Sequence, residues 1–149
     1  MQSSPSTDKV NLCKQIQQLD KSIRFVGLAN RLGSLVATCY RDNLVPLLTE
    51  KETSDYVMKA VLRAATREDF ESKIGKLEYS IGKYEQLVRA TIPVRLSDKA
   101  EHGDSYGGEI DDEDTAKLYL LLSFDLNSDV AVIIETKVLP ILTNKLTHL

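Results

Sequence analysis

The sequence contains no tryptophan and only three phenylalanines, so its core must be built mainly from Leu, Val, Ile and Tyr. Long apolar runs are also absent. The two longest, Leu118–Leu122 and Val130–Ile134, span five residues each, whereas a membrane-spanning helix needs about 20. Residues 1–5 lack the charged and apolar regions of a secretory signal. These absences predict a cytoplasmic protein with no membrane partner.

Cysteine is scarce, with only Cys13 and Cys39. Two thiols are too few for the disulfide framework of a small secreted domain. A cytoplasmic chain of 149 residues can bury enough surface to fold without such a staple. We therefore expect both cysteines to be reduced and to act as small buried apolar side chains.

The residues of familiar catalytic motifs are missing. The only two histidines are His102, within an acidic stretch, and His148, next to the C-terminus, and neither is placed to serve a nucleophile. Phosphate-binding glycine motifs are absent, and Gly107–Gly108 stands among carboxylates that would repel a phosphate. The sequence therefore predicts a protein that is not an enzyme and that carries no cofactor.

Charge is unevenly distributed along the chain. The net charge is −3, but residues 98–114 hold eight carboxylates against one lysine, which gives this stretch −7 and leaves +4 on the rest. A mildly basic body without a concentrated cationic face does not predict nucleic-acid binding.

The hydrophobic periodicity predicts alternating helices and strands. We expect helices over Thr7–Leu19, from Thr49 to a stop at Gly75 with a bend near Thr66, and from Val130 to the C-terminus, and strands at Ile23–Ala29, Leu35–Tyr40, Lys76–Gly82, Gln86–Val94 and Lys117–Phe124. The last strand is apolar at almost every position, so it belongs in the middle of a sheet with both faces covered. The predicted fold is an α/β (α+β) domain with a single five-stranded antiparallel sheet of order 2-1-5-4-3. The terminal helices cover one face of this sheet and the middle helix covers the other.

Several local signals refine these elements. A capping box at Thr49–Glu52 should start the middle helix, and a second cap at Thr66–Asp69 should follow its bend. Asn127–Asp129 should cap the last helix, which Pro140 should kink or restart. The core face of the middle helix is predicted to comprise Val57, Met58, Val61, Leu62 and Ala65. One face of the strand at 76–82 is predicted to comprise Leu77, Tyr79 and Ile81.

The chain is predicted to form one domain over residues 1–149. Residues 1–7 are expected to be a flexible N-terminus. Residues 97–115 form an acidic loop insertion before the last strand, without periodicity of its own.

The segment Ala29–Ala37 (ANRLGSLVA) resembles the first hairpin of roadblock domains, and the order of elements resembles the profilin-like roadblock and longin type. This resemblance implies a platform for protein–protein contacts, which typically pairs into dimers and serves small GTPases or larger scaffolds. The segments SIRFVGLANRLGSLV, RAATREDFESKIGKLEYSIGKYE, ATIPV and LLSFD are similar to a family of uncharacterised archaeal proteins. That similarity implies a cytoplasmic archaeal origin and no particular activity.

The candidate interface residues lie on the middle helix and the second hairpin. Lys59, Arg63 and Arg67 recur every four residues and form a basic stripe that suits an acidic partner or the acidic loop of a second copy. A solvated helix face is the alternative, and Glu71 is placed to neutralise part of the stripe. Tyr79 and Tyr84 flank the hairpin tip, where tyrosine serves interfaces and ordinary cross-strand packing equally.

Three functions remain open at this stage. The first is a non-enzymatic, roadblock-like interaction module with an unidentified protein partner, most simply a homodimer that pairs through the 76–82 strand edge or the middle helix. The second is a PAS-like small-molecule sensor, which requires a cavity of ligand size beside Val57 and Val61. The third is a metal-binding protein that uses acidic-loop oxygens. The candidate ligands are Asp104, Glu109, Asp111, Asp112, Glu113 and Asp114, although their spacing does not fit an EF-hand, and a solvated loop is the alternative.

Overall fold

The computed structural model describes residues 5–95 and 117–147. Its first helix, α1 (Pro5–Gln17), begins two residues earlier than predicted. Residues 5–7, which were assigned to the N-terminus that precedes the helix, form its first residues. Proline suits the first turn of a helix, where its missing N–H has no helical acceptor.

The first hairpin joins β1 (Ile23–Asn30) to β2 (Leu35–Tyr40). Asn30 organises its turn, because its Oδ1 accepts hydrogen bonds from the N–H groups of Leu32 and Ser34, both at 3.0 Å. Gly33 has φ of +86°, a conformation that side chains with a Cβ rarely adopt. The predicted turn with glycine at this position is confirmed.

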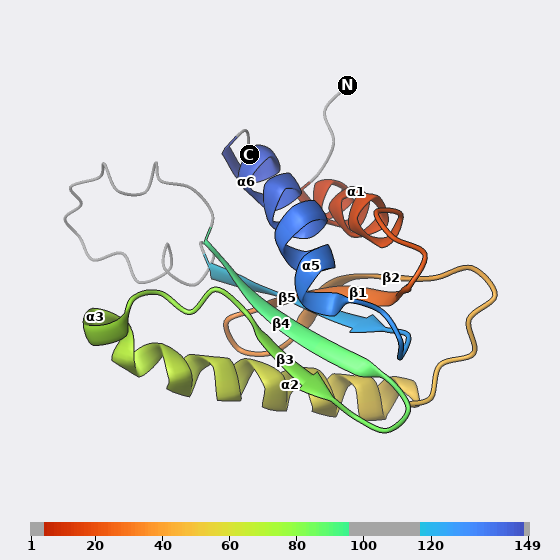
Figure 1. Ribbon diagram of the computed structural model, residues 1–149, viewed down its shortest axis with the longest axis horizontal. Helices are drawn as coiled ribbons and strands as arrows, with labels where there is room; N and C mark the ends of the chain where they lie inside the picture. Colours follow the sequence, from red (N-terminus) through yellow and green to blue (C-terminus); the bar gives the residue numbers. More distant parts are fainter. Residues whose placement is uncertain (1–4, 96–116, 148–149) are drawn as a thin grey trace.

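Five strands form a single antiparallel sheet of order β2-β1-β5-β4-β3 (Figure 1), as predicted. The remaining strands are β3 (Ser80–Lys83), β4 (Val88–Arg95) and β5 (Lys117–Phe124). The β3 pairing ends at Ser80–Thr91, so Pro93 of β4 lies beyond it. At this position a missing N–H costs no pairing with β3.

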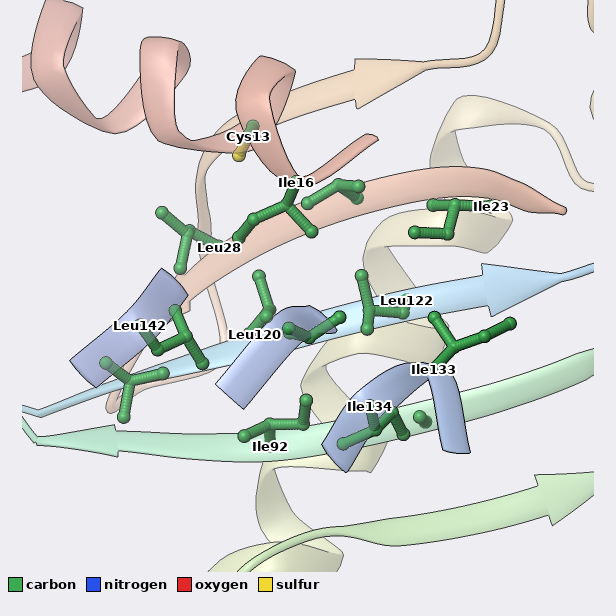
Figure 2. Close-up of a cluster of buried hydrophobic side chains, with 14 of the residues drawn as sticks. Cys13, Ile16, Ile23, Leu28, Ile92, Leu120, Leu122, Ile133, Ile134 and Leu142 are labelled. Atoms are coloured by element: carbon green, nitrogen blue, oxygen red, sulfur yellow. The ribbon is translucent and has the colours of Figure 1, made fainter. Parts of the chain in front are cut away.

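The central strand β5 is buried on both faces. Its even-numbered residues from Leu118 to Phe124 belong to one core cluster, whereas Tyr119 and Leu121 belong to a second cluster on the opposite face. α1 and the C-terminal helix cover the first face. Figure 2 shows Ile16 of α1, Leu120 of β5 and Ile134 of the C-terminal helix meeting in this first core.

The second face is covered by α2 (Glu50–Arg67), which continues into η1 (Glu68–Phe70) and α3 (Glu71–Ile74). Figure 1 shows α2 on the side of the sheet opposite α1 and the C-terminal helix. The predicted capping box is present, with the Glu52 N–H donating to Thr49 Oγ1 at 3.1 Å and the Thr49 N–H donating to Glu52 Oε1 at 2.9 Å. Gly75, with φ of +95°, ends the segment as predicted.

The predicted second cap near Thr66 is wrong. The Thr66 hydroxyl donates to the Arg63 carbonyl at 2.8 Å, and η1 begins without a side-chain cap. A threonine hydroxyl inside a helix can donate its hydrogen bond to a backbone carbonyl of the preceding turn. Its presence therefore does not indicate the start of a new helix.

The C-terminal helix comprises α5 (Val130–Ile133), a π-helical segment η3 (Ile134–Val138) and α6 (Leu139–Thr147). The backbone N–H of Leu139 donates to Ile134 O, five residues earlier. Pro140 has no N–H with which to continue the regular ladder, and its ring crowds the preceding turn. The predicted restart at this proline is therefore confirmed. The predicted side-chain cap at Asn127–Asp129 is wrong, because the Ser128 hydroxyl donates to Asp125 O and Asp129 makes no side-chain cap bond.

Candidate interaction surface

The open edge of β3 is the first exposed feature. Among residues 5–95 and 117–147, β3 pairs with β4 alone, and three of its four residues are exposed. The Tyr84 N–H donates to Leu87 O at 2.9 Å. Because hydrogen-bonded and non-hydrogen-bonded pairs alternate along antiparallel strands, the N–H and C=O of Ile81 point away from β4. This edge therefore offers unpaired backbone groups to another strand.

The strand at this edge is shorter than predicted. Lys76–Tyr79 precede it as irregular chain, and Leu77 and Tyr79 do not share a face. Leu77 packs against the cluster beneath α2, and Tyr79 packs against the cluster on the other side of the sheet. The alternating pattern was present, but without a ladder to fix the pleat these side chains are free to take opposite sides.

Two exposed apolar side chains lie along α2. Met58 is 54% exposed and Leu62 is 63% exposed, and Ala65 is exposed on the same face. Their assignment to the core is wrong. The buried residues of α2 are instead Thr53, Val57, Ala60, Val61 and Ala64. The exposed stripe lies towards the first hairpin, because a Cβ placed on Gly33 would come within 2.9 Å of Met58 Cα.

A groove follows the C-terminal end of α2 and leads to β3. It has a volume of about 580 Å³ and runs from Thr66 past Phe70 and Ile74 to Glu78. Phe70 is 62% exposed and Ile74 is 82% exposed. The groove ends two residues before β3, and solvent-exposed apolar surface of this kind is typical of contact sites.

The predicted basic stripe is present and exposed. Lys59, Arg63 and Arg67 are all solvent-exposed on α2, and the Arg63 guanidinium lies 5.6 Å from the Tyr56 ring centroid. Glu71 does not neutralise the stripe as expected. Its carboxylate accepts from Arg95 Nη2 at 3.1 Å and from the Leu77 N–H at 3.2 Å.

The two tyrosines of the second hairpin differ in their surroundings. The Tyr79 hydroxyl donates to the Glu135 carboxylate in the C-terminal helix, and this hydrogen bond raises the pKa of Tyr79. Tyr84 is 49% exposed at the hairpin tip. Of the two, Tyr84 is the one available to a partner, and Tyr79 joins β3 to the helix covering the first core.

A buried ionic group, which sequence reasoning missed, ties the end of α2 to β5. Lys117 Nζ and the Tyr119 hydroxyl both bond to Glu68 Oε1, and the Glu68 and Lys117 side chains are 10% and 19% exposed. Glu68 Oε2 is buried and has no hydrogen-bond partner in the part of the chain that the structure describes. Burial, followed by the nearby Glu68 charge, raises the pKa of Tyr119. No local pattern links residues that are about fifty positions apart.

The small-molecule sensor requires a cavity beside Val57 and Val61. These side chains are 0% and 3% exposed and pack directly under the sheet. The hollow between the sheet, the start of α2 and residues 44–48 measures about 20 Å³, room for about one water molecule. Between α2 and the sheet, the described structure therefore gives the sensor no chamber for a whole ligand.

The acidic residues considered as metal ligands, and His102 and His148, lie outside the described residues. Across residues 5–95 and 117–147, no cluster of three or more His, Cys, Asp or Glu side chains could hold a metal ion. In the same two ranges, no helix is long and apolar enough to cross a bilayer.

Both cysteines are free thiols. Cys13 is fully buried, and burial raises its pKa to about 12, so it stays protonated at neutral pH. Cys39 is only partly buried, which corrects the expectation that both are inside. Burial also raises the pKa of Cys39.

No protein-family model matches the chain, and no curated protein matches it. Several solved structures do match the chain. A structure described as MglB with tetrameric arrangement aligns with a TM-score of 0.66 at 11% identity, covering 97% of this chain and 89% of that one. The gliding protein MglB from Thermus thermophilus aligns with a TM-score of 0.64 at 11% identity, covering 98% and 93%. A roadblock/LC7 domain from Streptomyces avermitilis aligns with a TM-score of 0.58 at 9% identity, covering 91% and 93%. At such low identity these likenesses show the fold alone: the chain has the roadblock/LC7 fold, as the first hairpin and strand order suggested.

Proposed function

We propose that this chain is a non-enzymatic protein-interaction module that pairs with a second copy of itself through β3. The observation that carries the proposal is the open β3 edge, together with the groove that ends at Glu78, two residues before β3, and exposes Phe70 and Ile74. Two β3 edges related by a twofold axis are self-complementary, because antiparallel pairing satisfies the same backbone groups on both copies. A cytoplasmic location remains part of the proposal.

The charge pattern of α2 supports the same arrangement. The first half of the helix carries Glu52 and Asp55, whereas its second half carries Lys59, Arg63 and Arg67. When the twofold axis that relates two copies is perpendicular to α2, the two α2 helices run antiparallel, so the acidic half of each lies along the basic half of the other. The basic stripe then has an acidic partner in the second copy. The solved structure described as MglB with tetrameric arrangement gives a roadblock-like precedent for assembly.

The decisive experiment measures mass by light scattering during size-exclusion chromatography at about 100 μM protein. We expect twice the monomer mass. Ile81→Pro should give a monomer, because proline removes the outward N–H while leaving the bonds to β4 in place. Ile81→Ala is the matched control, since it shortens the same side chain but keeps the N–H, and it should remain dimeric.

A second pair of variants tests the groove. Ile74→Glu places a charge among the apolar side chains beside β3 and should also give a monomer. Val132→Glu makes the same kind of change at a 51% exposed position in α5, on the other side of the sheet, and should not alter the mass. A monomeric wild-type chain, or a dimer that survives both Ile81→Pro and Ile74→Glu, would exclude this interface.

A further inference from the structure

At one end of the sheet, the face that packs against α2 carries polar side chains. Phe25 of β1, Ser123 of β5 and Arg89 of β4 are register partners, so their side chains share one face. Ser123 is 3% exposed and follows five apolar residues on β5. Its small side chain leaves the hollow of about 20 Å³ under residues 44–48.

Two arginines from different strands line this hollow, Arg24 and Arg89. Arg24 reaches Asp125 at 3.3 Å, but Arg41 already holds both oxygens of that carboxylate at 2.7 and 3.1 Å. Arg89 forms no ion pair within the described part of the chain, and its guanidinium lies over the Tyr56 ring, 4.0 Å from the centroid. The carboxylate of Asp125 therefore compensates Arg41 and Arg24 together and leaves Arg89 without a counter-charge from the described residues.

The surroundings make this excess positive charge costly. Burial lowers the pKa of Arg89, and the neighbouring Arg24 charge acts in the same direction. The hydroxyl-bearing residues Thr53 and Ser123, both buried, also line the hollow. A half-buried pair of arginines beside two hydroxyl groups is an environment that suits a bound oxyanion.

We propose that this hollow receives the carboxylate of an acidic side chain from a protein partner. The hollow of about 20 Å³ has room for about one water-sized group, so it admits one oxygen of a carboxylate, whereas a phosphate presents three terminal oxygens and needs more room. Arginine forks match a carboxylate through paired N–H donors. The mouth is bordered by residues 44–48, where Val45 is 81% exposed and Leu47 is 57% exposed. A polypeptide covers such apolar surface around a buried arginine, and a free small acid does not.

No residue of β3 lines the hollow, so its occupation does not depend on the self-association proposed above. The site would let the module hold an acidic partner whether one copy or two are present. A monomer in the mass measurement would leave the proposed carboxylate site untouched. In the same way, failure of the carboxylate site would not affect the proposed dimer.

The test is an NMR titration of the ¹⁵N-labelled chain, following the arginine Nε–H signals. The probes are acetyl-aspartate amide, its neutral counterpart acetyl-asparagine amide, and inorganic phosphate. We expect saturable shifts of the Arg24 and Arg89 signals with the aspartate probe, at millimolar concentration, and none with asparagine. Equal response to aspartate and asparagine, or tighter binding of phosphate, would overturn the proposal.

Two variants and one control locate the binding. Arg89→Gln should weaken binding of the aspartate probe by about tenfold or more. Ser123→Val fills the hollow while keeping both arginines and should abolish the shifts even if Arg89→Gln folds poorly. Lys14→Gln removes the same unit of charge from an exposed position on α1, across the sheet, and should change affinity less than about twofold. Unchanged affinity in Ser123→Val contradicts the proposed pocket.

Discussion

The Arg89 guanidinium lies over the Tyr56 ring, with its central carbon 4.0 Å from the ring centroid. The contact joins β4 to the first half of α2, so it fixes the helix against the sheet at the edge of the second core. Burial raises the pKa of Tyr56 and lowers that of Arg89. Desolvation of both groups strengthens the attraction between the cation and the ring face.

Removing the ring should therefore weaken the fold. We expect Tyr56→Leu to lower the free energy of unfolding by about 1–2 kcal/mol, through the lost cation–π contact and packing. Tyr56→Phe keeps the ring and should cost less than about half as much. Urea unfolding followed by circular dichroism measures both. If the two variants were equally stable, the ring would contribute nothing beyond its apolar volume.

Gly27 is required by close packing in the middle of β1. A Cβ at this position would lie 2.8 Å from Phe25 Cζ and 2.9 Å from Leu35 Cδ2. Both neighbours are held against the second core, so Gly27→Ala should cost about 1–3 kcal/mol.

Gly82 on β3 gives the matched comparison. A Cβ there meets only Tyr84 Cε2, at 3.9 Å. Gly82→Ala should leave stability unchanged or raise it by up to about 1 kcal/mol, because alanine loses less backbone freedom on folding. The thermal midpoint should fall in Gly27→Ala, and in Gly82→Ala it should equal or exceed that of the wild type. If Gly82→Ala lost as much stability as Gly27→Ala, close packing around Gly27 would not be the reason for its loss.

The sheet order could be predicted because its strongest signal is local. The run Lys117–Phe124 is apolar on both alternating faces, which places it centrally, and Asn30–Gly33 marks a hairpin by turn chemistry alone. The burial of α2 could not be predicted as well. Two neighbouring stripes, one through Val57 and Val61 and one through Met58 and Leu62, have the same helical period. The sheet covers the first stripe, and only the tertiary arrangement decides this.

The candidate surfaces also include one that could be predicted from local sequence and one that could not. The exposure of Arg63 follows from its place in a charged helical stripe. In contrast, the Arg89–Tyr56 contact and the Arg24–Arg89 hollow join residues from separate strands and a helix, with no spacing rule between them. The signal that could have drawn attention to the hollow is Ser123, a small polar residue near the end of an otherwise apolar central strand.

Asp20 should give the fold a measurable acid dependence. The Lys137 ammonium donates to its carboxylate at 2.9 Å, and this bond, with the Ser22 N–H, holds the pKa of Asp20 at about 2. Because the folded pKa is depressed, the stabilisation is complete above the ordinary carboxyl pKa and is lost as pH falls towards 2. Asp20→Asn should cost about 1 kcal/mol at pH 7. The gap between variant and wild type in urea unfolding should close between pH 4 and pH 2. A gap of constant size across this range would show that Asp20 acts by packing.

The buried Glu68–Lys117 pair should be far more sensitive to the loss of one partner than an exposed pair is. Lys117→Met leaves the Glu68 charge buried beside the Tyr119 hydroxyl alone, which should lower the free energy of unfolding by about 3 kcal/mol. The exposed pair of Lys51 and Asp55, at 3.7 Å, provides the control. Lys51→Met should change stability by less than about 0.5 kcal/mol.

The double variant Lys117→Met/Glu68→Gln separates the two causes of that loss. Glutamine carries no charge to desolvate, so the double variant should be more stable than Lys117→Met alone by about 1–2 kcal/mol. Chemical unfolding of the four chains completes a double-mutant cycle. Glu68→Gln is favourable in the Lys117→Met background only if the Glu68 charge is left uncompensated there. Additive losses of stability would therefore mean that Lys117 stabilises β5 through its aliphatic stem and not by compensating the Glu68 charge.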